Sequence, residues 1–426
     1  MAAVDDARPA TVTAGELPGG YFARRFASLS NAHFRLLFLG NLLQFGSMQM
    51  QQLVRSFLVF QMTGSFAYLG AVAMANAVPG LLFAPVGGVL ADRAPKKTII
   101  QLGQGYNAIN AAILAVLAGT GLLRIEHLMI SAVLQGAVNS VMMPARQSII
   151  SELVGRERLM NAIGMNTSGQ NLMQLAGPAL AGVLLATTNP AAVFWVMGGM
   201  YALAVTFTVR IPAKPLFAYD GRARGPRRGG LRDLVEGMRY VAQDPPIRTL
   251  IIVNFIIVLA TQPYQMMLAG FVKEVLGKGA AEQGVLLTFT GIGALAGSFV
   301  VASLGERNRG RILLIVAAVA GVSLIAFASS RNYHLTMAIM LIVGATQATR
   351  MSLGQVLIQS YSQDEFRGRV MAVWFMQFSL VQVGTFLVGI LSEALGPQLA
   401  IGGLAGTMLI ALVFVTAFMP RMRQLQ

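Results

Sequence analysis

A short cluster of charged residues separates two long apolar stretches of the sequence. Residues 87–97 read GGVLADRAPKK, and they follow an apolar run over residues 66–90. The carboxylate of Asp92 and the cations of Arg93 and Lys97 can form ion pairs and can bind helix ends, where the backbone carries partial charges. No nucleophile and no converging acid–base pair accompanies them, so the chemistry that they indicate is electrostatic contact rather than bond-making.

The composition indicates a helical membrane protein. Of the 426 residues, 55% are hydrophobic and 12% are charged, whereas a soluble protein carries about twice that charged fraction. Apolar stretches long enough to cross a bilayer as helices recur along the chain. A large soluble helical domain would need a polar face on most of its helices, which these stretches lack. The absence of cysteine excludes disulfides and thiolate metal sites.

The distribution of cations predicts the orientation of the chain. With the N-terminus inside, only Arg124, Lys273, Lys278 and Arg331 lie outside and Arg55 lies within a span, which leaves 27 of the 32 Lys and Arg on the cytoplasmic side. This asymmetry predicts cytoplasmic termini, and it assigns the net charge of +15 to contacts with anionic lipids rather than nucleic acid. Twelve spans are predicted, at residues 34–61, 66–91, 98–121, 126–150, 159–187, 190–210, 248–273, 280–304, 311–330, 334–357, 367–394 and 397–419.

The longest polar stretch, residues 211–246, divides the chain into two halves. It contains GRARGPRRGG, which is typical of a flexible linker, and then LRDLVEGMRYVAQ at 231–243, whose apolar residues share one helical face. A basic segment of this kind could instead bind RNA, but a solvated linker is the more usual role. The predicted domains are a cytoplasmic tail with an interfacial helix at 1–32, an N-terminal six-helix bundle at 33–210, a linker with an amphipathic helix at 211–246, a C-terminal six-helix bundle at 247–420 and a tail at 421–426.

An internal repeat relates the two halves. A shift of 213 residues aligns Asn41 with Asn254, and one further residue of offset places GVLADRAPKK at 88–97 over ASLGERNRGR at 302–311. First spans therefore match first spans, and the loop after the second span matches the loop after the eighth. Two parallel six-helix halves are an architecture of transporters, in which the substrate site lies between the halves.

At these residues the chain resembles the major facilitator superfamily. The stretch at 88–97 is similar to that family's loop signature, Gly-x-Leu-Ala-Asp-Arg-x-Gly-Arg-Lys, with Pro95 in place of the second Gly. The resemblance covers residues 30–420 and implies an all-α membrane protein with 12 transmembrane helices in two pseudo-symmetric bundles. The residues that match the signature or its degraded second copy are Gly88, Asp92, Arg93, Lys97, Glu306 and Arg307.

The resemblance also implies partners for Asp92. These are the start of the eleventh span, near residues 366–368, and an Arg of the fourth span, best matched by Arg146. Such contacts form only when the halves close on the cytoplasmic side, so Asp92 is predicted to be a latch for the outward-facing state, and Glu306 a weaker one near Arg158. Alternatively, Asp92 only caps or solubilises a turn.

Two further stretches resemble the macrolide-efflux and enterobactin-exporter branch of the superfamily. They are PARQSIISELV at 144–154 and GPALAG at 177–182. In the second, Gly177 permits close helix packing and Pro178 removes a backbone hydrogen bond and permits bending. The branch often has Gly-Asp in the first span where this chain has Gly46-Ser47, which leaves the coupling ion open.

Polar side chains recur on the spans that line the central path in this superfamily. Each amide could instead join two helices, and the cation of Arg55 could extend to the outer surface. No Asp or Glu is expected at mid-membrane, whereas Arg55 and Arg350 are, so neutral or anionic cargo is the better electrostatic match. The predicted path residues are Asn41, Gln44, Gln52, Arg55, Gln135, Asn139, Gln170, Asn254, Gln262, Gln265, Gln347, Arg350 and Gln377.

The sequence thus predicts a secondary active exporter that works by rocker-switch alternating access. Its cargo would be a small amphiphilic or anionic molecule such as a drug, a siderophore or a lysolipid. A nutrient importer on the same fold and a non-transporting membrane sensor remain alternatives. The expected partners are the substrate, membrane lipids and protons as coupling ion, for a monomer in the plasma (inner) membrane. No enzymatic activity, cofactor, metal or nucleic-acid partner is expected.

Overall fold

The computed structural model describes residues 27–155, 158–212, 216–217, 230–303, 308–363 and 365–418. Each predicted span coincides with one helix or with two consecutive helices. The helices are η1 (Ala27–Ser30), α2 (Ala32–Thr63), α3 (Phe66–Arg93), α4 (Lys96–Gly119), α5 (Ile125–Leu153), α6 (Leu159–Thr187), α7 (Pro190–Val209), α8 (Gly230–Gln243), α9 (Pro245–Thr261), α10 (Tyr264–Glu274), α11 (Ala280–Ser303), α12 (Arg309–Ser329), α13 (Tyr333–Tyr361), α14 (Arg367–Phe375), α15 (Gln377–Leu395) and α16 (Pro397–Phe418).

Short polar residues set the starts of several helices. The side chain of Asn31 accepts hydrogen bonds from the backbone N–H groups of His33, at 2.9 Å, and Phe34, at 3.2 Å, and so satisfies donors that α2 itself cannot pair. Side chains at the same position cap four other helices, namely Ser65 for α3, Asn189 for α7, Asp244 for α9 and Asn332 for α13.

Two predicted spans are interrupted. The seventh consists of α9 and α10, which are separated at Pro263, a residue that lacks a backbone N–H. The eleventh consists of α14 and α15, which are separated at Met376. Each of these two spans therefore consists of two consecutive helices. Pro263 was an available signal for the first break, whereas the second break contains neither Pro nor Gly.

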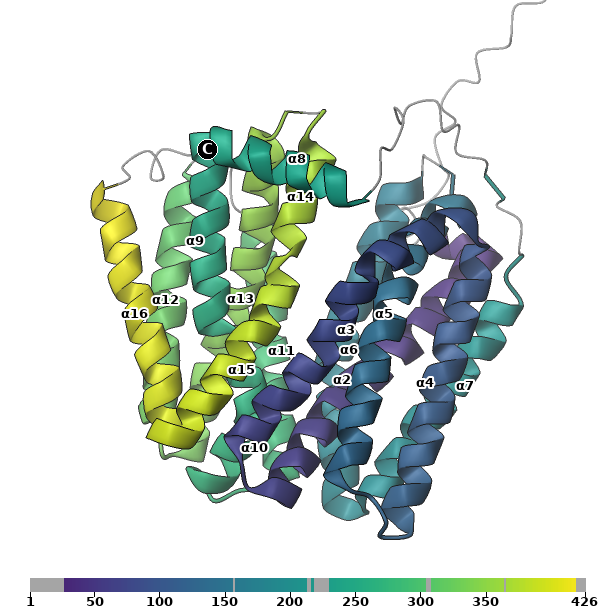
Figure 1. Ribbon diagram of the computed structural model, residues 1–426, viewed down its shortest axis with the longest axis horizontal. Coiled ribbons are helices and arrows are strands. Elements are labelled where there is room, and N and C mark those ends of the chain that lie inside the picture. The colour runs from purple at the N-terminus through teal and green to yellow at the C-terminus, as the bar shows by residue number, and fades with distance from the viewer. Residues whose placement is uncertain are drawn as a thin grey trace, which may run out of the picture.

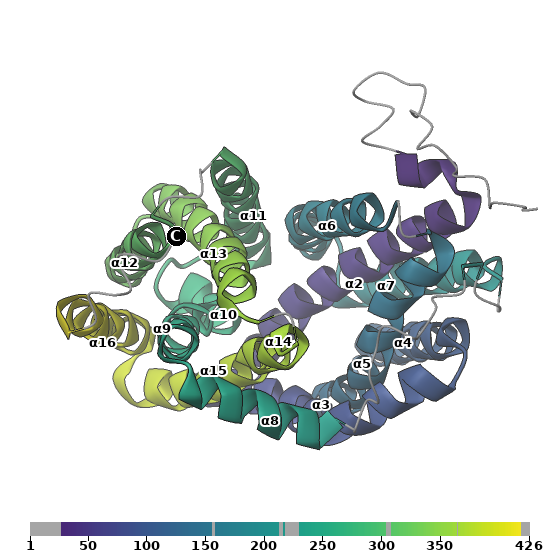
Figure 2. The ribbon, with the colours of Figure 1, turned by 90° about the horizontal axis from the view of Figure 1, so that it is seen from above.

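The helices form two groups, α2–α7 and α9–α16, that approach each other at one end of the molecule. Figures 1 and 2 show α8 lying across the opposite end, from α9 toward α3. We call the end at which α8 lies the α8 end, and the opposite end, where α3 begins and α10 ends, the far end. Contacts between the groups join α3 to α15, α6 to α11 and α2 to α10.

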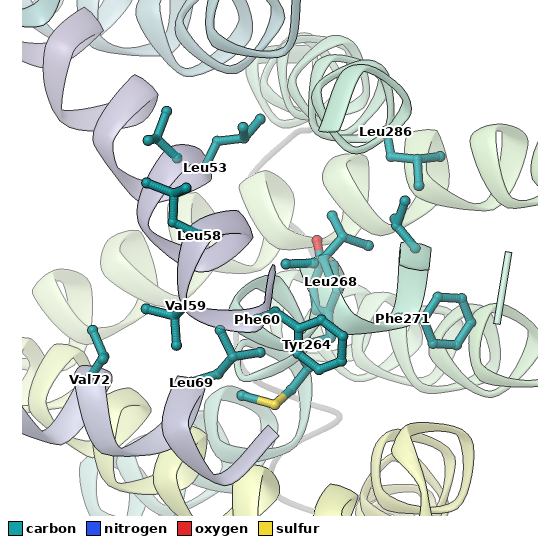
Figure 3. Close-up of a cluster of buried hydrophobic side chains, with 14 of the residues drawn as sticks. Leu53, Leu58, Val59, Phe60, Leu69, Val72, Tyr264, Leu268, Phe271 and Leu286 are labelled. Atoms are coloured by element: carbon teal, nitrogen blue, oxygen red, sulfur yellow. The ribbon is translucent and has the colours of Figure 1, made fainter. Parts of the chain in front are cut away.

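The buried cores follow the same division. At the far end a single core contains residues of both groups, and Figure 3 shows side chains of α2 and α3 meeting those of α10 and α11. Toward the α8 end there are two separate cores, one within α2–α7 around Phe34 and Ile149, and one within α9–α16 around Leu250 and Trp374. The groups are therefore packed together at the far end and diverge toward the α8 end.

The segment predicted as an amphipathic helix, residues 231–243, lies within α8. It packs on the start of α14, where Arg369 forms an ion pair with Glu236 at 3.4 Å and the rings of Tyr240 and Phe366 stack at 4.4 Å. The backbone of Arg369 leaves no room for a side chain at Gly237. The helix α8 is thus fixed to the second group of helices by specific contacts.

Within the described residues, eight segments are long and apolar enough to span a membrane. The remaining long helices, α2, α4, α6 and α13, carry the amide and Arg side chains described below, which lower their hydropathy. The eight segments are Phe66–Phe83, Ile125–Leu153, Pro190–Val209, Pro245–Glu274, Ala280–Val301, Arg309–Ser329, Arg367–Leu395 and Pro397–Thr416.

Close helix pairs repeat in the two groups. A Cβ atom at Gly136 of α5 would collide with the backbone oxygen of Asn76 on α3, and one at Gly344 of α13 would collide with that of Thr290 on α11. The pairs α3–α5 and α11–α13, which are the second and fourth spans of their groups, therefore touch through backbone atoms. Small residues at such contacts are the usual means by which membrane helices pack closely.

This packing predicts that Gly344→Ala destabilises the protein. The added methyl group forces α11 and α13 apart, and overpacking of this kind costs about 1–3 kcal/mol. The measurement is the midpoint temperature at which the purified protein unfolds on heating in detergent. Gly199→Ala on α7 is the matched control, because a Cβ atom there meets nothing within 4 Å. An equal effect of the two substitutions would contradict the packing.

Candidate transport cavity

A cavity of about 800 Å³ lies between the two groups of helices. Both groups contribute to its wall, and because they are joined at the far end, it is approached from the α8 end. Ten of the thirteen predicted path residues line it, namely Gln52, Arg55, Gln135, Asn139, Gln170, Gln262, Gln265, Gln347, Arg350 and Gln377.

Three predicted path residues do not line the cavity. Asn41 and Gln44 are buried within the first group, which α2 crosses obliquely (Figure 2). Asn254 is buried behind Arg350 and Gln377, to which it is hydrogen-bonded. These residues support the cavity wall rather than face the cavity.

The cavity wall also contains residues that the sequence analysis missed. Asn76 of α3 and Thr290 and Ser298 of α11 line it, although the predicted path used neither helix. Gln51 lies beside the predicted Gln52 and lines the cavity as well. Gln174, which shares a polar line with Gln170 in the sequence, also lines it.

A buried triad joins three helices of the first group. The guanidinium Nη2 of Arg146 on α5 donates to Asn41 Oδ1 on α2 at 2.6 Å, and Asn41 Nδ2 donates to Asn166 Oδ1 on α6 at 2.7 Å. The guanidinium also lies over the ring of Phe45, 4.5 Å from its centroid. The charge of Arg146 is thus stabilised by an amide oxygen and an aromatic face.

An equivalent triad joins the corresponding helices of the second group. Nη1 of Arg350 on α13 donates to Asn254 Oδ1 on α9 at 2.5 Å and to Gln377 Oε1 on α15 at 3.4 Å, and Asn254 Nδ2 donates to the same Gln377 oxygen at 3.3 Å. In each group, therefore, the fourth span (α5 or α13) supplies an Arg. The first span (α2 or α9) supplies an Asn, and the fifth span (α6 or α15) supplies an amide. The internal repeat predicted the pair Asn41 and Asn254, and the structure extends it to whole triads.

Arg55 forms a third buried cationic cluster. Its Nη2 donates to Gln135 Oε1 on α5 at 2.6 Å, and Gln135 Nε2 in turn donates to Gln51 Oε1. Arg55 is 9% exposed and lines the cavity. It is held by side chains of its own group, so it does not extend to the far-end surface.

The cavity has a positive and amide-rich wall. Among the residues that the structure describes, the buried charged side chains are Arg55, Arg146 and Arg350. No Asp or Glu is among the described residues of the wall, and 15 of the 32 lining residues are Asn or Gln. The wall therefore suits a neutral or anionic molecule that forms many hydrogen bonds. No group of three potential metal-ligating side chains lies together in the described ranges.

Polar and close-packed contacts between the groups close the far end. Oε2 of Glu393 on α15 accepts hydrogen bonds from Ser65 Oγ at 3.0 Å and from the backbone N–H groups of Phe66 at 2.8 Å and Ala67 at 3.3 Å, which form the N-terminus of α3. Gln283 Nε2 donates to Ser56 Oγ at 3.2 Å across the same boundary. No sequence pattern indicated this role for Glu393, because its partners are more than 300 residues away along the chain.

The predicted glycine–proline stretch contributes to this closure. A Cβ atom at Gly177 would approach Gln49 on α2 to 2.7 Å, and one at Gly182 would approach the Cα atom of Gly284 on α11 to 3.0 Å. Pro178 is buried within α6, and its backbone oxygen faces Gly284. The close packing that the stretch predicted is therefore present, within the first group and between the groups.

Only part of the predicted latch can be located. The side chains of Gly88 and Asp92 and the residues Glu306 and Arg307 lie outside what the structure describes. Arg93 is exposed, and Lys97 Nζ donates to the backbone oxygen of Val209 at 2.8 Å. Arg146 donates to Asn41 in this conformation, and α8 covers the start of α14.

Comparisons with known proteins agree with this architecture. A family model of the major facilitator superfamily, described as transmembrane secretion effector, matches residues 23–426. The multidrug efflux pump Tap of Mycolicibacterium fortuitum is 26% identical over 86% of this chain and 91% of its own. The enterobactin exporter EntS of Citrobacter koseri is 26% identical over 89% and 88%, respectively.

Solved structures show the same fold. The crystal structure of the nucleoside transporter NupG superposes with a TM-score of 0.68 at 14% identity, over 90% of this chain and 98% of that one. A bacterial homologue of the human lysosomal transporter Spinster superposes with a TM-score of 0.66 at 18% identity, over 91% and 94%.

The triads predict that Asn41→Leu destabilises the protein. The substitution leaves the buried guanidinium of Arg146 without its only hydrogen-bond acceptor, and an unsatisfied buried charged group costs about 3 kcal/mol or more. Gln52→Leu on the same helix is the matched control, since that amide is exposed to the cavity. Thermal stability in detergent is the measurement, and equal midpoints for the two variants would contradict the role of Asn41.

Proposed function

The chain belongs to the transmembrane secretion effector family of the major facilitator superfamily, and we propose that it exports a small amphiphilic or anionic molecule by rocker-switch alternating access. Membership of this family makes the chain a membrane-embedded transporter rather than an enzyme. The direction of transport, the cargo and the conformational cycle are the proposed parts.

The topology that we propose has twelve membrane spans. The four long helices with lower hydropathy, α2, α4, α6 and α13, complete the set, because their polar residues face the cavity or one another rather than lipid. Residues 33–210 and 247–420 are then two pseudo-symmetric six-helix bundles, joined by the linker at 211–246. With Lys and Arg concentrated at the α8 end, that end and both termini are cytoplasmic.

The observation that carries the proposal is the position of the cavity. It lies between the two bundles, it is closed at the far end by a core common to both, and the bundles diverge at the α8 end. In the proposed topology this arrangement is an inward-facing state. Cargo enters from the cytoplasm or the inner leaflet, and the bundles then rock to open the far end.

Two carboxylates on one helix pair control the cycle in this proposal. Glu393 of the eleventh span holds the N-terminus of α3 at the far end. Asp92, at the other end of α3, binds the N-terminus of the eleventh span after the cytoplasmic side closes. A carboxylate at a helix N-terminus is stabilised by unpaired N–H groups and by the helix dipole. The Glu393 contact therefore favours the inward-facing state, and the Asp92 contact favours the outward-facing state.

Relatives favour export as the direction of transport. Proteins similar along nearly their whole length are named as a multidrug efflux pump and as exporters of enterobactin, and another is named as a staphyloferrin A transporter. The arginines and amides of the wall fit an anionic or hydrogen-bonding cargo. We propose protons as the coupling ion, the plasma membrane as the location and a monomer as the working unit. An importer on the same fold is the second candidate.

Transport itself is tested in a host that expresses the chain, with a screen for growth protection and efflux against drugs, siderophores and lysolipids. Inside-out vesicles that accumulate the cargo on energisation would establish export, whereas depletion would establish import. We expect Asp92→Asn to abolish transport at unchanged expression, because the amide cannot bind the helix N-terminus as a charge. Full transport by this variant would remove the cytoplasmic latch.

The far-end latch is tested by thiol labelling. The chain contains no Cys, so Ser56→Cys introduces a single thiol at the far-end closure, where Ser56 is 2% exposed. We expect Glu393→Gln to speed its labelling by an impermeant maleimide added from outside by about threefold to tenfold, since a charge at a helix N-terminus contributes about 1 kcal/mol. Glu126→Gln is the control, an exposed carboxylate on the same side. Equal labelling with and without Glu393 would refute the latch.

A further inference from the structure

The two triads are chemically alike but differ in access to the cavity. None of Arg146, Asn41 and Asn166 lines the cavity, whereas Arg350 and Gln377 do. The triad of the second bundle therefore faces the cavity as well as its own helices.

A single residue accounts for part of the difference. Phe45 covers the guanidinium of Arg146 with its ring. The shift of 213 residues that aligns Asn41 with Asn254 aligns Phe45 with Val258. Val258 is too short and carries no aromatic face, and it lines the cavity itself. Both arginines are 4% exposed, but Arg350 has no ring over it at the position where Phe45 covers Arg146.

The charge of Arg350 is only partly compensated. Its side chain is 4% exposed, its Nε has no hydrogen-bond partner, and its acceptors are two amide oxygens. Amides carry partial charges, so they offset a buried cation less well than an anion does. Of its two acceptors, Asn254 is held at 2.5 Å, but Gln377 is at 3.4 Å.

Gln377 is also loosely held by its other neighbours. Asn254 reaches its oxygen at 3.3 Å, and its Nε2 lies 3.7 Å from the sulfur of Met351. An anion that replaced Gln377 at Arg350 would exchange a long contact with an amide oxygen for an ion pair, in which both the donor and the acceptor are charged.

We propose that Arg350 is an oxyanion-binding site of the central cavity, at which a carboxylate or phosphate group of an organic acid displaces Gln377. This inference rests on the proposed transport function and specifies its cargo. Gln377 is the first residue of α15, directly after the break from α14 at Met376. Its displacement releases the hydrogen bonds that fix α15 to α9 and α13 at this break, so α14 can move toward the cytoplasmic closure after cargo binds.

Arg55 provides a second position for the same anionic group. Arg350 lies 11 residues from the α8 end of α13, about 16 Å, and Arg55 lies 8 residues from the far end of α2, about 12 Å. Arg55 also precedes Ser56, which takes part in the far-end closure. An anion passing outward therefore meets Arg350 first and then a cation beside the far-end closure.

The chain contains an intrinsic reporter for the test. Trp374 is buried near the end of α14, and its ring packs against Gly354, one turn from Arg350 on α13. The only other tryptophan of the sequence is Trp195, so Trp195→Phe makes the fluorescence report on Trp374 alone. The purified full chain in this background is titrated with 4-phenylbutyrate, with its neutral amide 4-phenylbutyramide, and with inorganic phosphate.

We expect a saturable change in fluorescence with 4-phenylbutyrate and none with the amide. Arg350→Gln should weaken the binding of the acid about tenfold or more, because it removes a hydrogen bond to a charged group. Gln377→Glu should also abolish the response, since it supplies Arg350 with a permanent carboxylate in the same shape. Arg146→Gln, the matched control, should leave the affinity within about twofold.

Equal responses to acid and amide, or equal losses in Arg350→Gln and Arg146→Gln, would overturn the site. A folded Gln377→Glu protein that still binds the acid would do the same. A saturable response to phosphate alone would support the site and assign it to a free oxyanion instead of the acid group of cargo. Export of neutral cargo without acid binding would refute this inference and leave the proposed function intact. Acid binding without transport of any compound would support the anion site and refute the proposed transport function.

Discussion

A guanidinium buried inside a membrane has to be hydrogen-bonded where it lies, because neither water nor a distant charge offsets the cost of burying it. The described buried cations of this chain, Arg55, Arg146 and Arg350, are stabilised by the amide oxygens of Gln135, Asn41 and Asn254. These partners fix the first and fourth helices of each bundle against each other. They also leave a net positive charge beside the cavity, because an amide side chain has no net charge with which to neutralise an arginine. The architecture and the preference for anionic cargo thus follow from the same constraint.

Duplication explains why this constraint is met in the same way twice and why its consequences differ. Both bundles place Arg, Asn and an amide on their fourth, first and fifth helices. In the first bundle the aromatic ring of Phe45 completes the enclosure of Arg146, and the triad acts as an internal brace. In the second, Val258 leaves Arg350 at the cavity, and the amide of Gln377 lies at a helix break. In our proposal, the arrangement that braces the first bundle serves as a binding site in the second.

The sequence predicted the helices and most of the cavity wall, because both depend on local patterns. Apolar length locates the spans, and amides within them must face a cavity or another helix. The pattern could not separate these two cases, so Asn41, Gln44 and Asn254 were predicted to line the cavity although they lie behind its wall. That distinction depends on the oblique path of α2, which is set by packing. Glu393 carried no local signal, since its partners are at the start of α3 and become neighbours only when the bundles meet.

The helix α3 links the two ends of the molecule. Its 28 residues correspond to about 42 Å of helix, so its first and last turns lie at opposite ends. The N-terminus of α3 is bound by Glu393, and its C-terminal turn carries Asp92, the residue proposed to bind the start of the eleventh span. Because that span is itself broken at Met376, the break would allow its inner part, α14, to move relative to α15. An anion that loosens Gln377 acts at this break, and in this way a local exchange of hydrogen bonds would be converted into closure of the inner side.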